Sequence, residues 1–162
     1  MLALTAAGAC SSTPAANDAP FFPATFRQFG FRQVRACRAP GEHSGLNGFT
    51  VWVDDASADS YDSILAASAD VHQMPAGAVV VKELYRDRAC GADQVDRWVA
   101  MKKIPGYDPA NGDWMWQDVT NQRGITAEGR VGSCIACHAG GDDMTCAGYG
   151  EAHGADYLCT AP

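Results

Sequence analysis

The residues Cys134-Ile135-Ala136-Cys137-His138 form a C-x-x-C-H motif, whose residue types and spacing are typical of covalent attachment of a c-type haem. Two thiols a short turn apart can add to the two vinyl groups of one porphyrin, and His138 then reaches the iron from the same side. The motif therefore predicts one haem c, bound through Cys134 and Cys137, with His138 as an axial ligand of the iron. The rest of the chain determines what happens on the other face of the haem.

Two other kinds of site use a C-x-x-C pair. A zinc site needs a second closely spaced pair of ligands, and the candidates Cys146, His153 and Cys159 are too scattered to supply one. A thioredoxin-like redox pair should follow an early strand and begin a helix, whereas this motif lies late in the sequence. Haem attachment is the better explanation of the motif.

The residues before the motif predict an α+β fold, with a mostly antiparallel β-sheet, flanking helices and a C-terminal helix that carries the haem motif. Runs of β-branched and aromatic residues predict strands over 49–53, 78–85, 98–102 and 114–119. Helices are predicted over 23–37, from Ser57 or Asp59 onward, and from residue 125 through 138. Because the last three strands follow one another without helices between them, they should pair antiparallel.

The first twenty residues resemble the end of a bacterial lipoprotein signal. Small apolar residues lead to Cys10, and a Ser/Thr/Pro/Ala/Asn run follows over 11–20. We therefore expect Cys10 to be lipidated, 1–20 to be signal end and tether, and 21–162 to form the haem domain. An ordinary cleaved signal peptide is the alternative. Both interpretations predict export to the periplasm, with a membrane anchor in the first case.

The composition fits one domain with a leader, since 162 residues with 47% hydrophobic content can form a core. A formal charge of −7 argues against nucleic acid and against an anionic membrane surface as partners.

Four cysteines remain after those assigned to haem and lipid, and they permit three pairings. We expect Cys146–Cys159 to close the glycine-rich tail into a loop, and Cys37–Cys90 to tie the early helix to the end of a strand. Free thiols are the alternative, although an exported protein favours disulfides.

One lysine stands out in the predicted strand 78–85. Strand alternation places Ala78, Val80, Lys82 and Leu84 on one face, so that Lys82 lies between aliphatic side chains. A lysine on an edge strand, or one that snorkels to solvent, would explain this pattern. The alternative is a lysine that points into the haem pocket.

The segment 75–84, with Gly77 and the Val81-Lys82-Glu83 run, resembles the Gly-x-x-x-Val-Lys-Glu segment of the cytochrome P-460 family. Three further features occur in the same order as in that family. They are the strand 50–54 followed by a helix with Tyr61, the sequence Gly112-Asp113-Trp114, and the late haem motif. The resemblance covers about residues 23–140.

The resemblance implies a small, mostly antiparallel β-domain that is often dimeric and holds one c-type haem. It implies that Lys82 is cross-linked through its side-chain nitrogen to a porphyrin meso carbon. The implied activity is oxidation of hydroxylamine or a related small nitrogen compound, with electrons passed to a redox partner protein. Related beta-type cytochromes c-prime share the fold, lack the cross-link and bind nitric oxide under an aromatic cap.

The chain departs from the hydroxylamine oxidisers of the family at the distal side of the haem. Those proteins are thought to use an acidic residue there as a proton acceptor, whereas the run 96–101 is apolar where that acid would lie. Asp96 could serve only if the register differs by a residue or two. An apolar cover favours neutral diatomic ligands, so nitric-oxide binding is the alternative function.

Plain electron transfer is a second alternative. It would require a sixth protein ligand to the iron, such as Met101, Met115 or Met144.

Overall fold

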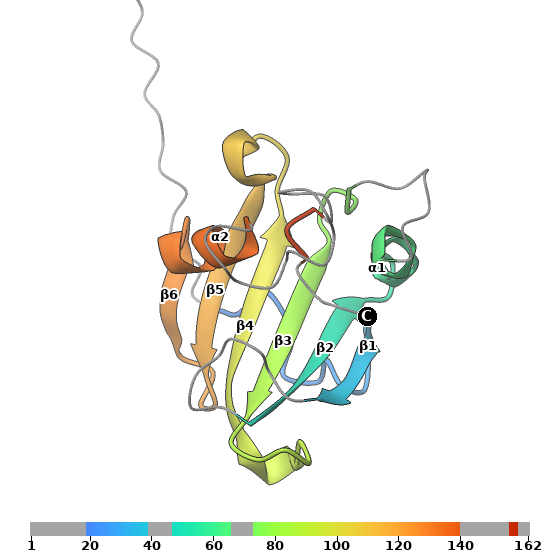
Figure 1. Ribbon diagram of the computed structural model, residues 1–162, viewed down its shortest axis with the longest axis vertical. Helices are drawn as coiled ribbons and strands as arrows, with labels where there is room; N and C mark the ends of the chain where they lie inside the picture. Colours follow the sequence, from blue (N-terminus) through green and yellow to red (C-terminus); the bar gives the residue numbers. More distant parts are fainter. Residues whose placement is uncertain (1–18, 39–46, 66–72, 140–155, 159–162) are drawn as a thin grey trace, which may run out of the picture.

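The computed structural model describes residues 19–38, 47–65, 73–139 and 156–158, which are built around one six-stranded sheet (Figure 1). The strand order is β1-β2-β3-β4-β5-β6, and each strand pairs antiparallel with its sequence neighbours. The strands are β1 (Phe31–Arg38), β2 (Gly48–Asp54), β3 (Val79–Tyr85), β4 (Val95–Lys103), β5 (Trp114–Thr120) and β6 (Ile125–Gly129). The helices are α1 (Ala58–Leu65) and α2 (Gly132–His138), with short 3-10 turns η1 (Ala92–Gln94) and η2 (Pro109–Asn111). The predicted α+β class is confirmed.

Among the described residues, helices cover one face of the sheet only. Helices α1 and α2 cover what we call the front face, and the segment 19–30 crosses the opposite, back face (Figure 1). Neither described helix is long and apolar enough to cross a membrane.

The two faces of the sheet form two separate hydrophobic cores. The front core includes Phe49, Val51, Val53, Val80, Leu84, Met101, Trp114 and Trp116, packed against Tyr61 and Ile64 of α1. The back core includes Phe22, Phe26, Val79, Val81, Tyr85, Val95, Trp98, Ala100 and Val119. Because both faces are covered, the central strand β3 is buried along nearly its whole length.

The strands predicted over 49–53, 78–85, 98–102 and 114–119 are confirmed as β2, β3, β4 and β5, and the helix predicted after Ser57 is α1. Helix α1 begins where Asp54 Oδ1 accepts a hydrogen bond from the Ser57 backbone N–H at 3.1 Å. Its buried side chains Ala58, Tyr61 and Ile64 repeat at helical spacing toward the front core.

The helix predicted over 23–37 is wrong. Residues 24–30 form turns that end at Gly30, whose φ of +78° is the left-handed region that stops a helix. Phe31 then starts β1, which pairs with β2. Phe26 is buried in the back core while Phe29 is 70% exposed, so these two residues do not form the single apolar face that a helix requires.

The helix predicted from residue 125 through 138 is also wrong in its first half. Ile125–Gly129 is the edge strand β6, and only Gly132–His138 is helical. A hairpin turn, in which the Thr120 backbone N–H donates to the Gly124 carbonyl at 2.8 Å, returns the chain alongside β5. The Gln117 amide then donates to Glu128 Oε2 at 2.6 Å and ties the two strands together.

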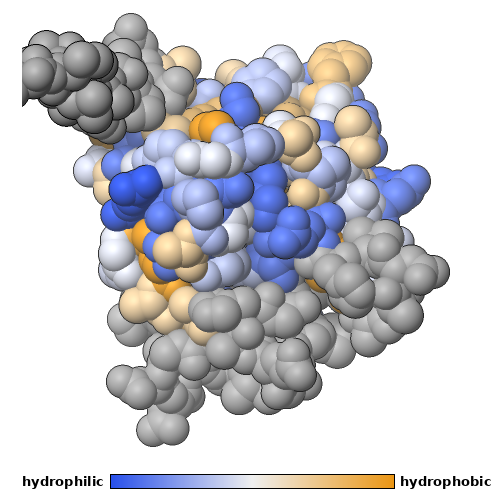
Figure 2. Space-filling model, turned by 90° about the horizontal axis from the view of Figure 1, so that it is seen from above, coloured by the Kyte–Doolittle hydropathy of each residue, from blue (hydrophilic) through white to orange (hydrophobic). Residues whose placement is uncertain are grey.

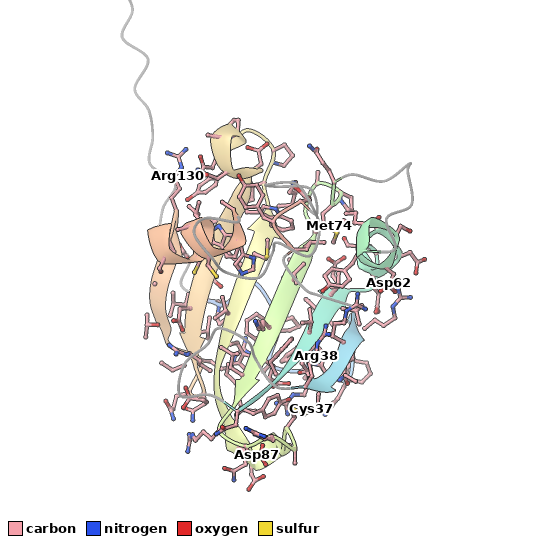
Figure 3. The ribbon with its side chains drawn as sticks, in the orientation of Figure 1. Cys37, Arg38, Asp62, Met74, Asp87 and Arg130 are labelled. Carbon is pink, nitrogen blue, oxygen red and sulfur yellow. A yellow bond between two sulfur atoms is a disulfide. The ribbon has the colours of Figure 1, made fainter. Side chains whose placement is uncertain are left out.

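The predicted disulfide Cys37–Cys90 is confirmed, with Cα atoms 5.8 Å apart. It joins the end of β1, where Figure 3 labels Cys37, to the turn after β3. Cys37 therefore lies in a strand, and not in the early helix that we expected. The pair Cys146–Cys159, the lipid site Cys10 and the residue Met144 lie outside the described residues.

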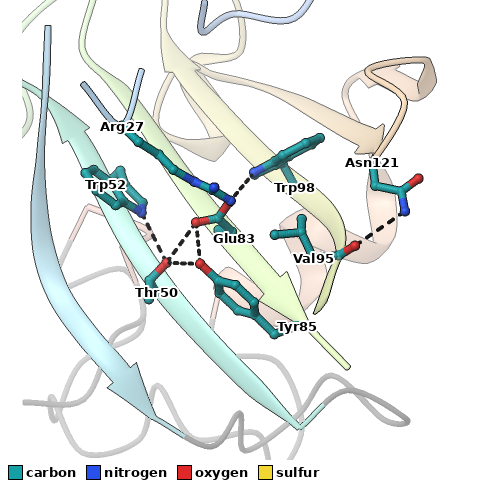
Figure 4. A network of polar contacts seen from close by, with 8 residues as sticks. All are labelled: Arg27, Thr50, Trp52, Glu83, Tyr85, Val95, Trp98 and Asn121. Atoms are coloured by element: carbon teal, nitrogen blue, oxygen red, sulfur yellow. Dashed lines mark hydrogen bonds and ion pairs between the residues drawn. The ribbon is translucent and has the colours of Figure 1, made fainter. Parts of the chain in front are cut away.

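The back core contains a buried carboxylate with a full set of donors (Figure 4). Glu83 is fully buried and accepts hydrogen bonds from Trp98 Nε1 at 2.9 Å, from the Tyr85 hydroxyl at 2.5 Å and from the Arg27 guanidinium. Thr50 Oγ1 adds a longer contact at 3.4 Å. These partners compensate the cost of burying a charge, so the cluster fixes the register of β2, β3 and β4.

We expect this cluster to make the protein sensitive to alkaline pH. Burial, followed by the hydrogen bond to Glu83, raises the pKa of Tyr85 from 10.0 to about 12. Because the folded state holds the proton more tightly, this stability is fully present below pH 10 and is lost as the pH rises to about 12. The loss should amount to about 2 kcal/mol, measured by urea unfolding across that range. Tyr85→Phe should flatten the decline, whereas Tyr107→Phe, which changes a half-buried tyrosine, should not. An equal slope in wild type and Tyr85→Phe would contradict the assignment.

Candidate functional site

Helix α2 carries the C-x-x-C-H motif and lies in front of the sheet, over β5 and β4 (Figure 1). Val131, Cys134 and Ile135 pack against the front core, which holds the short helix in place. Cys134 and Cys137 are half-buried and are not joined in a disulfide. Burial raises the pKa of the Cys134 thiol, and the nearby Asp118 carboxylate raises it further. Both thiols belong to α2, which packs against the front face of the sheet.

The imidazole of His138 is oriented by the backbone of a distant segment. Its Nδ1 lies 2.5 Å from the carbonyl oxygen of Tyr157. A carbonyl can only accept, so Nδ1 carries the proton in this contact. This is the arrangement in which a histidine binds metal through Nε2 while a carbonyl fixes its tautomer. The ring also packs edge-on against Trp116, with centroids 4.7 Å apart.

Lys82 and His138 line the same cavity, between α2 and the front face. The cavity has a volume of about 20 Å³ and is lined by Val51, Val80, Lys82, Val99, Ala100, Met101, Trp116, His138 and Leu158. Strand alternation thus predicted the correct face for Lys82. The strand β3 is internal to the sheet, so the edge-strand explanation is wrong. The Lys82 ammonium lies over the Phe49 ring, 4.4 Å from its centroid.

The donor chemistry of this site fits a haem c, whereas its present volume does not. Two thiols and a histidine Nε2 stand on one helix, opposite aliphatic side chains. A cavity of about 20 Å³ has room for one water. A porphyrin would therefore need more room between α2, Leu158 and the sheet than this cavity offers.

The segment 156–158 was not predicted to contribute to the site. Its Asp156 accepts from Lys103 Nζ at 2.5 Å and from the Met74 backbone N–H at 2.7 Å, and its carbonyl accepts from Trp114 Nε1 at 2.9 Å. Tyr157 packs so closely on Gly112 that a Cβ there would lie 2.8 Å from the ring. The only sequence signal is the adjacent pair Tyr157-Leu158 in a glycine-rich tail without periodicity.

The described residues that line the cavity include no carboxylate. Asp96 lies away from it, with its carboxylate 3.2 Å from Arg86 Nε and 3.8 Å from Arg97 Nε. The nearest acid by register is Asp118, which pairs across the strands with Val99 and accepts from Arg97 Nη1 at 3.4 Å.

The two described methionines that we considered as iron ligands fall on opposite faces. Met101 lines the cavity beside His138. Met115 pairs with Lys102, and alternation from Trp114 and Trp116 places it on the back face. Met101 is therefore the only one of these two that could approach the iron.

Comparison of the chain with models of known protein families and with curated proteins found no match. The resemblance to the cytochrome P-460 family rests on the sequence segments given above and on their order along the chain.

Proposed function

We propose that this protein is an exported mono-haem c-type cytochrome of the P-460 kind that oxidises hydroxylamine or a related small nitrogen compound. The observation that supports this most is the shared cavity of Lys82 and His138. A lysine on an internal strand that meets the predicted axial ligand agrees with the resemblance, in which Lys82 is the residue bound to the porphyrin. The electrons would pass to a redox partner protein.

The chain's own residues have distinct tasks in this proposal. Cys134 and Cys137 would hold the porphyrin by thioether bonds, and His138, whose Nδ1 donates to the Tyr157 carbonyl, would bind the iron through Nε2. The iron would supply a site for a small nitrogen ligand and an acceptor for its electrons. Water would be kept from the sheet side of the cavity by the apolar side chains of Val51, Val80 and Val99.

The link that the resemblance implies would join the side-chain nitrogen of Lys82 to a porphyrin meso carbon. Starting from the ammonium, forming this bond would break two N–H bonds and one C–H bond, release three protons and pass two electrons to an oxidant such as dioxygen. The product nitrogen has lost its ammonium charge, which relieves the cost of placing Lys82 among aliphatic side chains.

Nitric-oxide binding without turnover is the alternative, and the apolar lining favours it. A neutral diatomic ligand needs no proton acceptor, and no carboxylate is among the described residues of the cavity. Electron transfer is a second alternative, since Met101 lies in the same cavity and a thioether can bind haem iron.

Spectra and turnover of the purified haem protein separate these functions. We expect reduction of an electron-accepting dye on addition of hydroxylamine, and a ferrous absorption band far to the red that Lys82→Leu abolishes. Lys102→Leu is the matched control, because Lys102 lies on the back face with its ammonium 5.9 Å from the Phe21 centroid.

Two results would redirect the proposal. Binding of nitric oxide without any hydroxylamine turnover would assign the protein to the beta-type c-prime alternative. A low-spin spectrum that becomes high-spin in Met101→Leu would assign it to electron transfer.

A further inference from the structure

Five side-chain nitrogen atoms in the described part of the chain are shielded from solvent and have no hydrogen-bond partner. They are Arg35 Nε, Arg38 Nε, Arg38 Nη2, Arg97 Nε and Trp116 Nε1. All five are donors, and none can accept. Arg97 Nε lies 3.8 Å from Asp96 Oδ2, and Arg35 Nη1 lies 3.8 Å from Asp62 Oδ1, so these two guanidiniums have ion-pair partners. Buried donors without acceptors cost free energy, so the remaining donors, above all the two of Arg38, call for an acceptor-rich partner.

All five donors lie on the front face, the face of Lys82 and His138. Arg35 pairs across the strands with Val51, Arg38 with Phe49 and Arg97 with Leu84, and these three partners belong to the front core. Trp116 packs directly on the His138 ring. The unpaired donors and the proposed haem site therefore share one surface.

The register orders these groups along the sheet. Trp116 and Val80 lie in one cross-strand row, Lys82 in the next, and Arg38 and Arg97 in the row after that. The first and third rows are four residues apart along β3, which is about 13 Å. A flat ligand held at α2 and lying over Lys82 can therefore present its far edge to the arginines. Figure 3 shows Arg38 at that end of the sheet, beside Cys37.

Arg38 has the geometry for a carboxylate. Nε–H and Nη2–H lie on the same edge of the guanidinium, the edge that binds both oxygens of one carboxylate. The guanidinium stacks on Phe49, 5.3 Å from the ring centroid, and Lys82 Nζ lies on the same ring. Among the described residues no carboxylate forms an ion pair with Arg38, whereas Arg32 on the same strand pairs with Asp59 and Asp62.

We propose that Arg38 forms a carboxylate-binding site on the front face, with Arg35 and Arg97 as flanking cations. This inference rests on the proposed function, in which the carboxylates are the two propionates of the haem. Arg38 binds one propionate through Nε–H and Nη2–H, and the flanking guanidiniums lower the cost of enclosing both negative charges. A free dicarboxylic acid has the same chemistry and is the other source that a test must distinguish.

The test compares Arg38→Gln with Arg88→Gln, which removes the same charge from an exposed residue in the turn after β3. In the haem-loaded protein we expect Arg38→Gln to shift the propionate bending band in the resonance Raman spectrum and to lower Tm by about 5 °C. In haem-free protein carrying Cys134→Ala and Cys137→Ala, the same change should leave Tm unchanged or raise it, because it removes unpaired donors. Arg88→Gln should leave the Raman band unchanged in the haem-loaded protein and should leave Tm unchanged in both proteins.

The outcomes separate this inference from the proposed function. If wild type carries haem but Arg38→Gln alters neither the Raman band nor Tm relative to Arg88→Gln, the propionate site is wrong and the haem assignment stands. If wild type carries no haem, the proposed function fails, and the site is then tested with succinate. Stabilisation by succinate that Arg38→Gln abolishes would assign a free dicarboxylate, and no stabilisation would overturn the site altogether.

Discussion

Replacing Cys134 and Cys137 together by alanine is expected to abolish covalent haem in the purified protein. In the proposed function these two thiols of α2 are the covalent anchors of the haem, and they stand on the same helix as His138, whose Nδ1 contacts the Tyr157 carbonyl. The proposed thioethers would also hold the porphyrin against Lys82, so we expect the cross-link not to form without them. Acidified acetone should then extract all haem from the variant and none from wild type.

The matched control is the double variant Cys37→Ala/Cys90→Ala, which removes the disulfide at the other end of the sheet. It should lose stability and keep its haem. Two results would contradict the account. The first is extraction of haem from intact wild type, and the second is covalent haem in the Cys134→Ala/Cys137→Ala protein.

Replacing Asp156 by alanine is expected to lower the free energy of unfolding by about 3 kcal/mol. The change leaves the Lys103 ammonium, whose side chain is 8% exposed, without its carboxylate, and it also deprives the Met74 backbone N–H of its acceptor. Urea unfolding followed by tryptophan fluorescence measures the loss.

The double variant Lys103→Met/Asp156→Leu serves as the control, because it removes both charges of the pair. It should recover a large part of the lost stability. Equal losses in the single and double variants would mean that the buried charge of Lys103 is not the cause.

The positions of Lys82 and His138 could be predicted from the sequence because each depends on a local pattern. The motif fixes the three groups on α2, and strict alternation in a strand of β-branched residues fixes the face of Lys82. Both patterns remain valid whatever lies around them. Lys82 and His138 lie close together because β3, β4, β5 and β6 are neighbours in the sheet and α2 follows β6 directly.

The arginines of the front face could not be predicted in the same way. Because the sequence predicts a helix over 23–37 and its first strand over 49–53, neither Arg35 nor Arg38 has a place in the predicted sheet. Their face depends on a β1–β2 register that shifts twice along the pair, between Gln33 and Arg35 and again between Arg35 and Arg38. Irregular pairing of this kind has no period in the sequence.

The segment 156–158 illustrates a different limit. Its Tyr157 carbonyl contacts His138 and its Asp156 carboxylate pairs with Lys103, and these contacts join residues 19 and 53 positions apart. Neither contact leaves a pattern in neighbouring residues, so only the folded chain reveals that Tyr157 orients the histidine.

The mass of the haem-bearing peptide tests the central claim most directly. The haem-loaded protein would be digested without reduction, and the peptide that absorbs visible light would be isolated and sequenced by mass spectrometry. We predict one species that contains Cys134 and Cys137 with a single haem, joined to the peptide that contains Lys82. An unmodified peptide spanning Cys134 to His138, from protein made in a host that attaches haem to other C-x-x-C-H proteins, would contradict the account.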